Sequence, residues 1–235
     1  MTWEDVTITD LGTLPKVDMR ASDSPLNNGK VVGFALNTVL DPFSLAGQGF
    51  FPTQTRPFCG SWSAACLMIN QSGQVVACSF TNSTINPVTG TPTLGPFLWD
   101  KEEGMLDLGT LGGTSGCAIY LNNRGQVVGY SNLDGDLATH PFLWDRGVIK
   151  DLGTLGGSSG VANWISDAVE IVGRATYAGD QVQHAFHWKN GIKTNLGTLP
   201  GDPCSFSQAI NSKGQIVGES EPVCFTPQQA RAFLW

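Results

Sequence analysis

Short runs of alternating apolar and polar residues recur along the chain, and they recur in a fixed order. Residues 117–157 read CAIYLNNRGQVVGYSNLDGDLATHPFLWDRGVIKDLGTLGG, and residues 161–201 repeat the same order of elements. Runs of this length, separated by clusters of Gly, Asn and Asp, predict β-strands joined by tight turns. The pattern therefore predicts an all-β protein built from an internal repeat.

Each repeat unit divides into four predicted strands. The first strand ends at Leu121, Ile165 or Ile210, and a turn such as NNRG or NSKG leads to the second, QVVGYS or QIVGES. The third is HPFLWD, HAFHWK or RAFLW, and the fourth is VIKDLGTL or IKTNLGTL. The phrase DLGTLGG then forms the end of the fourth strand and the crossover to the next unit. It lacks the glycine spacing of a phosphate-binding loop, so we expect a structural role for it.

Five such units account for the whole chain. The residue that closes the G-x-V-V-G box of the second strand recurs every 44 to 52 residues, at Gly33, Ala77, Gly129, Gly173 and Gly218. Four antiparallel strands per unit without helices predict a β-propeller. We expect a single domain over 1–235, with blades at about 18–56, 57–112, 113–156, 157–200 and 201–235.

The two ends of the chain are complementary. The last unit stops after its third strand, and residues 3–14 form a fourth strand with no unit before them. Pairing of 3–14 with 230–235 would complete the last blade and close a five-bladed ring, which leaves neither strand with an open edge. An open solenoid is the alternative architecture.

The combination of I-N-x-x-G-Q-V-V-G, H-A/P-F-L-W and D-L-G-T-L-G-G resembles the HAF repeat family, named for the His-Ala-Phe found here at His184, Ala185 and Phe186. The resemblance covers nearly the whole chain, although Gly95 and Arg231 replace the histidine in the second and fifth units. It implies a bacterial, often exported repeat protein with a propeller fold. It implies no established activity and therefore no catalytic residues.

Charge and cysteine content narrow the functional classes. With 13 Lys and Arg against 20 Asp and Glu, and without a basic cluster, the chain is not expected to bind nucleic acid. No apolar run predicts membrane insertion. The sequence has no charged-then-apolar leader at its start, so an exported protein that has lost its leader and a cytosolic protein both remain open. We expect an extracellular or periplasmic location, because disulfides are the favoured interpretation of the cysteines and form in oxidising compartments. We also expect a monomer.

Cys204 and Cys224 both fall at the rim that carries the crossovers and variable loops, so a bridge between them is the first expected disulfide. Cys78 is expected to pair with Cys59 or Cys66. Cys117 is interpreted as a buried apolar residue. The cysteines lack zinc-site spacing, the three histidines do not converge with a third ligand, and we expect no metal and no cofactor.

The loops between second and third strands vary in length and share one face, so this face is the first candidate for ligand binding. Exposed Tyr and Trp on the first strands or crossovers are further candidates, since they would stack against a sugar ring, although packing between blades is an alternative role for them. The candidate ligand-binding residues are Tyr120, Trp164, Trp62, His140, His184, Asp134, Asp136, Asp180, Glu219, Glu221 and Arg231.

A non-enzymatic extracellular module that binds a glycan or another surface ligand is the function that these features favour. A hydrolase that uses rim or channel carboxylates is one alternative, since paired carboxylates cleave glycosidic bonds. A structural repeat module of a larger adhesin is the other. Blade number alone does not separate these classes.

Overall fold

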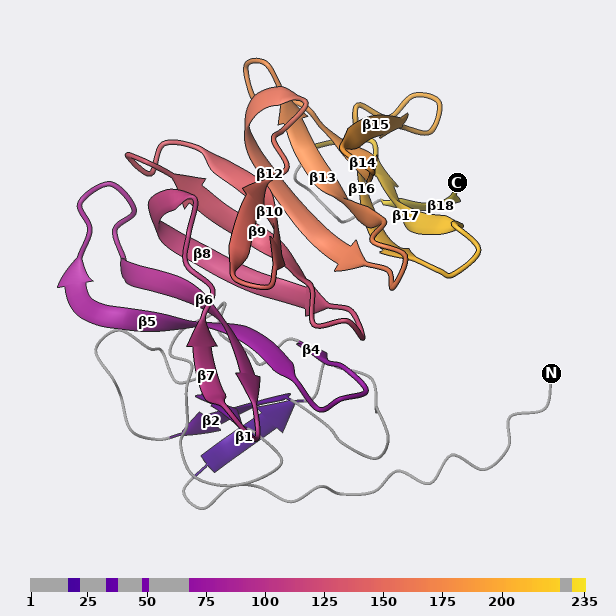
Figure 1. The fold of residues 1–235 in the computed structure, drawn as a ribbon. Helices are drawn as coiled ribbons and strands as arrows, with labels where there is room; N and C mark the ends of the chain where they lie inside the picture. Colours follow the sequence, from indigo (N-terminus) through magenta and orange to yellow (C-terminus); the bar gives the residue numbers. More distant parts are fainter. Residues whose placement is uncertain (1–16, 22–32, 38–47, 51–67, 225–229) are drawn as a thin grey trace.

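The computed structural model of the chain describes residues 17–21, 33–37, 48–50, 68–224 and 230–235 (Figure 1). All regular elements in these ranges are β-strands, which confirms the all-β class. Among the described residues, no helix is long and apolar enough to cross a membrane.

Three units of four antiparallel strands form the middle of the chain, and in each the strands pair in sequence order. The second unit contains β4 (Met68–Ile69), β5 (Val75–Ile85), β6 (Pro92–Asp100) and β7 (Gly104–Asp107). The third contains β8 (Gly112–Leu121), β9 (Val127–Leu133), β10 (Thr139–Asp145) and β11 (Val148–Asp151). The fourth contains β12 (Gly156–Ile165), β13 (Ile171–Tyr177), β14 (Gln183–Lys189) and β15 (Ile192–Gly197).

Single parallel pairs, Leu94 with Ser115 and Thr139 with Ser159, join these units into one mixed sheet of 12 strands. Two further sheets have three described strands each. The first unit contains β1 (Val17–Ala21), β2 (Gly33–Asn37) and β3 (Gln48–Phe50). The fifth contains β16 (Cys204–Ile210), β17 (Ile216–Glu221) and β18 (Arg231–Leu234). The predicted ends of the first strands, at Leu121, Ile165 and Ile210, are confirmed.

The described strands form no closed ring. β18 is the last strand of its sheet, and residues 3–14, the expected fourth strand, lie outside the described residues. The predicted closure is therefore left as a prediction. In the first unit, β3 lies within 41–51, where the third and fourth strands were expected, and pairs with β2.

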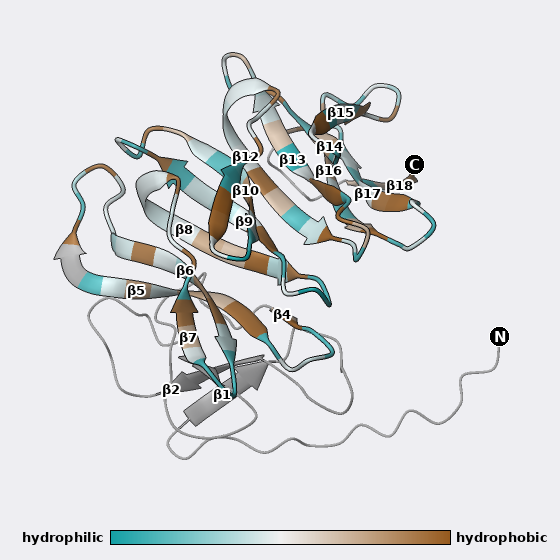
Figure 2. Ribbon diagram, in the orientation of Figure 1, coloured by the Kyte–Doolittle hydropathy of each residue, from teal (hydrophilic) through white to brown (hydrophobic). Residues whose placement is uncertain are grey.

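The core lies between the units. Val127 and Val128 are both fully buried, but Val127 packs in a cluster with Leu98 of the second unit, whereas Val128 packs with Phe186 of the fourth. Adjacent residues on a strand point to opposite faces, so the third unit is covered by a neighbour on each face. A sheet buried on both faces needs apolar runs rather than strict alternation, and Figure 2 shows hydrophobic positions on the strands with mostly hydrophilic connecting turns.

The glycine-rich phrase forms the crossover between units, as predicted. The first leucine of the phrase is buried in two copies, Leu108 at 4% and Leu152 at 8% exposure, and the equivalent Leu196 is half-buried. The carboxylate of Asp151 accepts the N–H of Gly153 over 2.7 Å, and Asp107 does the same for Gly109. A Cβ on Gly157 would lie 2.3 Å from the carbonyl oxygen of Tyr177, so this position has no space for a side chain.

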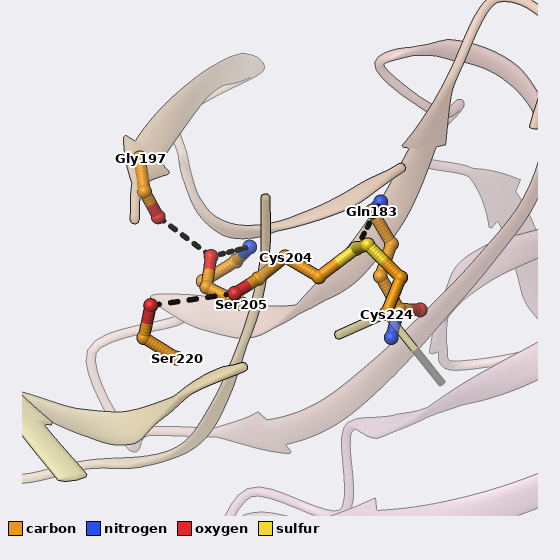
Figure 3. Close-up of a disulfide and its surroundings, with 7 residues drawn as sticks. Gln183, Gly197, Cys204, Ser205, Ser220 and Cys224 are labelled. Atoms are coloured by element: carbon orange, nitrogen blue, oxygen red, sulfur yellow. Dashed lines mark hydrogen bonds between the residues drawn. A yellow bond between two sulfur atoms is a disulfide. The ribbon is translucent and has the colours of Figure 1, made fainter. Parts of the chain in front are cut away.

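Two disulfides join described residues. Cys204 and Cys224 are bonded, as the sequence predicts, and Figure 3 shows the sulfur of Cys204 accepting the N–H of Gln183 from the fourth unit over 3.2 Å. Cys78 pairs with Cys117 rather than with Cys59 or Cys66, which lie outside the described residues. The predicted partners of Cys78 were wrong, because β5 and β8 bring Cys78 and Cys117 together from neighbouring units with Cα atoms 4.8 Å apart. Cys117 is buried as predicted, at 2% exposure, but it is not a free thiol.

Candidate functional site

The first strands of four consecutive units end at a cavity of about 450 Å³, which we call the inner-strand cavity. The last residues of β4, β8, β12 and β16 and the turns that follow them form its wall. Met68, Tyr120 and Trp164 line it from equivalent positions of three units. The cavity lies at the end of the units opposite to the loops between second and third strands.

Tyr120 and Trp164 are stacked in the wall of this cavity. Their ring centroids are 3.8 Å apart and the planes are inclined by 27°. Burial, together with the negative charge of Asp167, raises the pKa of the Tyr120 hydroxyl, which therefore stays protonated at neutral pH. Each ring covers one face of the other, and Tyr120 and Trp164 also pack against neighbouring hydrophobic clusters, as the alternative role in packing between blades predicts. The part of each ring that lines the cavity supplies apolar surface, and Tyr120 adds one hydroxyl donor, which suits a ligand with both apolar and hydroxyl groups.

The turns around the cavity are tied to one another by asparagine side chains. In the third unit, the amide of Asn122 donates to Gln126 Oε1 in its own turn over 2.8 Å and to the carbonyl of Ser166 in the next unit over 3.1 Å. Asn70 makes the same pair of bonds to Gln74 and Asn122. In the second and third units the I-N-x-x-G-Q motif thus holds the turn and links it to the next unit, and in the fifth unit Asn211 bonds Gln215 in its own turn over 2.8 Å.

One carboxylate in the cavity wall lies at such a link. The backbone N–H of Asn123 donates to Asp167 Oδ1 over 2.8 Å, and its side-chain amide donates to Oδ2 over 2.9 Å. Asp167 is exposed and lines the same cavity as Tyr120 and Trp164. A carboxylate with two fixed donors keeps further lone pairs for a ligand.

Glu170 is the second carboxylate of the cavity wall. It accepts from Lys189 and His187, each over 2.8 Å. The hydrogen bond from Lys189 is the main cause that lowers the pKa of Glu170, and His187 adds to it against the opposing effect of burial. Glu170 is therefore ionised and held by two donors.

The loop carboxylates Asp136 and Asp180, predicted as ligand-binding residues, are engaged within the protein. Asp180 accepts the backbone N–H and the hydroxyl of Ser158, both over 2.7 Å, and Asp136 makes the equivalent contacts to Thr114. Hydrogen bonds from Thr176 and Ser158 lower the pKa of Asp180. These two residues fasten a loop to the crossover strand, so their lone pairs are mostly used.

The predicted histidines have a related role. His140 Nδ1 donates to Asp151 Oδ2 over 2.9 Å, and His184 Nδ1 lies 3.1 Å from Asn195 Oδ1. Each pair connects the third strand of a unit to the crossover phrase at the end of its fourth strand. The two conserved phrases of the repeat, H-A/P-F and D/N-L-G-T-L, therefore meet in the same unit.

Arg231 stands at the histidine position of the fifth unit and forms an ion pair with Asp202 at 2.8 Å. Burial alone would raise the pKa of Asp202, but hydrogen bonds from Arg231 and Ser220 hold it below its ordinary value. Arg231 also donates to the carbonyl of Pro200 over 2.9 Å. Its predicted role in ligand binding thus competes with a structural one.

The remaining predicted residues do not gather at one place with these. Asp134 is exposed on its loop, Glu219 is half-buried in β17, and Trp62 lies outside the described residues. Glu221 is only 3% exposed. Burial of Arg174 lowers the pKa of its guanidinium group, and the negative charge of Glu221 opposes that shift.

The structure thus brings two predicted residues, Tyr120 and Trp164, to one cavity and adds three that sequence reasoning missed, Asn123, Asp167 and Glu170. Departure of the fourth turn from N-x-x-G-Q was the available signal. Within the described residues, no group of three His, Cys, Asp or Glu side chains is placed to hold a metal ion. No model of a known protein family matches the chain, and no curated protein is significantly similar to it in sequence.

Proposed function

We propose that the protein is a non-enzymatic binding module whose ligand is a glycan held in the inner-strand cavity. Tyr120 and Trp164 carry this proposal, because both line the cavity, and aromatic surface favours the apolar part of a sugar ring while amide and carboxylate groups bind its hydroxyls. Asn123 and Asp167 supply such groups in the same wall. The loop face is the less favoured location, since Asp136 and Asp180 are already hydrogen-bonded there.

Glycan-array screening followed by calorimetry on the bound glycan tests this proposal. Trp164→Ala should weaken binding at least about tenfold, the effect of losing one stacking contact worth about 1.4 kcal/mol. Asp134→Asn, on the exposed loop face, is the matched control and should leave affinity unchanged. Binding that survives Trp164→Ala but is lost in Asp134→Asn would move the site to the loop face.

A hydrolase is the second candidate, because Asp167 and Glu170 line one cavity. A glycosidase needs one carboxylic acid with a raised pKa as proton donor. The pKa of Glu170 is instead lowered, mainly by Lys189, which favours binding over hydrolysis. Release of reducing ends from a bound glycan, abolished by Asp167→Asn, would support the hydrolase.

We further infer that the five units close into a propeller of the HAF repeat type, with residues 3–14 beside β18. Two observations support this: among the described residues the fifth unit has the strand order of the others without a fourth strand, and Leu234 beside that edge is 67% exposed. Leu143 pairs with Lys150 in the third unit, and Leu234 and Thr9 are the equivalent positions.

A cysteine pair tests this register directly. Thr9→Cys with Leu234→Cys should form a new crosslink on oxidation, detected by peptide mapping, because directly opposed residues of paired strands lie within disulfide reach. Thr2→Cys with Leu234→Cys is the out-of-register control. Equal yields from both pairs would contradict an ordered closing strand.

An extracellular or periplasmic location is part of the same proposal. Two disulfides in one chain are typical of oxidising compartments. Thiol alkylation before lysis of the native cells should leave Cys78, Cys117, Cys204 and Cys224 unmodified. Their alkylation would place the protein in a reducing compartment.

A further inference from the structure

Only one of the four turns that surround the inner-strand cavity carries negative charge. Three of them read NQSGQ (70–74), NNRGQ (122–126) and NSKGQ (211–215), whereas the fourth reads SDAVE (166–170). Two neutral positions thus become Asp167 and Glu170, and the position of Arg124 and Lys213 becomes Ala168. The fourth unit's turn is thus more negative than each of the other three, through Asp167 and Glu170 in every comparison and also through Ala168 relative to Arg124 and Lys213.

The backbone of this turn is the same as in its neighbours, so the changes are not needed to shape it. Val169 donates to the carbonyl of Ser166 over 3.0 Å, as Gly125 does to Asn122 over 3.1 Å. Val169 has φ 61°, where Gly125 has φ 74°. A β-branched residue is strained in this left-handed region, and such strain is concentrated at functional sites.

Only one of the two carboxylates is balanced by a cation. Glu170 is paired with Lys189 and His187, but the contacts of Asp167 to Asn123 come from uncharged amides. Among the described residues that line the cavity there is no lysine or arginine. The wall therefore carries a negative charge in the cavity that Tyr120 and Trp164 also line.

We propose that the inner-strand cavity selects a ligand with a protonated amine next to an apolar ring face, the chemistry of a de-N-acetylated amino sugar. Asp167 would accept hydrogen bonds from the ammonium group, and Tyr120 and Trp164, which line the same cavity, would contact the apolar part of the ring. This inference rests on the proposed glycan-binding function and names its ligand class. It assigns Asp167 as the residue that determines specificity.

Calorimetry with three probes tests the inference: short β-linked oligomers of glucosamine, of N-acetylglucosamine and of glucose. The glucosamine oligomer should bind about tenfold or more tightly than the two neutral ones, since one charge interaction of about 1.4 kcal/mol changes affinity tenfold. Its affinity should fall as the pH rises through the pKa of the amine, whereas that of the neutral probes should not.

Asp167→Asn is the decisive variant. It introduces the residue that the third unit has at the equivalent position, Asn123, so folding should be retained. The preference for the amine should then disappear while binding of the neutral oligomers persists. Asp134→Asn, on the loop face, removes the same charge at a distance and should leave the preference intact.

The outcomes separate the two proposals. Equal binding of charged and neutral oligomers to the unmodified protein would overturn amine selectivity but leave glycan binding in the cavity standing. A preference that Asp134→Asn abolishes and Asp167→Asn does not would also overturn it. Absence of binding by all three probes and on a wider glycan array would overturn the proposed function itself.

Discussion

The Asp136 carboxylate accepts both polar hydrogens of Thr114, the backbone N–H over 2.7 Å and the hydroxyl over 2.8 Å. Asp136 lies in the loop between β9 and β10, and Thr114 lies near the start of β8, so the contact ties the third unit's loop to its incoming crossover. Asn86, from the long hairpin of the second unit, donates to the same carboxylate over 2.7 Å. One side chain thus connects two units.

Removal of the Asp136 charge should destabilise the fold. Asp136→Asn keeps a residue type that tolerates the left-handed backbone at φ 60° but loses one acceptor oxygen. We expect the free energy of unfolding in urea to fall by about 1 to 3 kcal/mol, the cost of breaking hydrogen bonds to a charged group. Asp134→Asn, two residues away and exposed, should change it by less than about 0.5 kcal/mol.

Acid should weaken the fold through the same kind of carboxylate. Burial alone would raise the pKa of Asp136, but hydrogen bonds from Thr114, Asn132 and Asn86 hold it below its ordinary value, and Asp180 and Glu170 also have lowered pKa values. A lowered folded-state pKa gives stability that is present above the unfolded-state pKa and is lost as the pH falls through the folded value.

Urea titrations from pH 7 down to pH 3 should therefore show a falling midpoint below about pH 5, where unfolded carboxyls begin to bind protons. The fall should be smaller in Asp136→Asn, which lacks one of the titrating groups. A midpoint that is independent of pH over this range, or equal slopes in both proteins, would contradict the structural role of these carboxylates.

Strand boundaries were predictable because each is set by local chemistry. The first strand ends at Leu121 because the side chain of the next residue, Asn122, closes the turn. Its amide group donates to Gln126 Oε1, and its side-chain oxygen accepts the backbone N–H of Gln126. Such a turn needs only residues four apart, so the motif contains all the information. The buried Leu108 and Leu152 were predictable for the same reason, from the repeated crossover.

Contacts between units were harder to predict, because spacing does not fix how neighbouring sheets align. Cys78 and Cys117 are 39 residues apart and belong to different units, and no local pattern joins them. The contact between Asp167 and Asn123 was not predictable for a related reason, since the two residues are 44 apart, although the departure of the fourth unit's turn from N-x-x-G-Q marks Asp167 itself. Tyr120 and Trp164 were found because the repeat alignment places them at equivalent positions.

Gly129 has a steric role that one methyl group should disrupt. It lies opposite Phe142 in the sheet register, and a Cβ there would be 1.9 Å from the carbonyl oxygen of Cys117. Because backbone must move to relieve this contact, Gly129→Ala should lower the free energy of unfolding by at least about 2 kcal/mol. In Gly95→Ala the new methyl meets the tip of Thr81 at 3.2 Å, which can move, so this control should cost much less. Similar losses in both variants would contradict the steric explanation.

Lys193 should make stability rise with pH on the alkaline side. Its ammonium group donates to the carbonyl of Gly153 and lies 4.1 Å from the centroid of the Phe186 ring. Burial lowers the pKa of Lys193 from 10.5 to about 8, against the opposing attraction of Asp151. Between these two values the unfolded chain binds more protons than the folded one, so folding becomes more favourable as the pH rises.

The measurement is the urea midpoint of the unmodified protein relative to Lys193→Arg and Lys193→Met, followed from pH 7 to pH 10. Arginine stays charged and methionine uncharged over this range, so neither variant has the proton release of Lys193. The unmodified protein should therefore gain stability relative to both variants as the pH rises. The gain should begin near pH 8, the folded-state pKa of Lys193, and continue to pH 10. Because the comparison uses only the change with pH, any fixed cost of losing the bond to Gly153 cancels. Offsets that stay constant over the whole range would show that the Lys193 proton is bound equally in the folded and unfolded states.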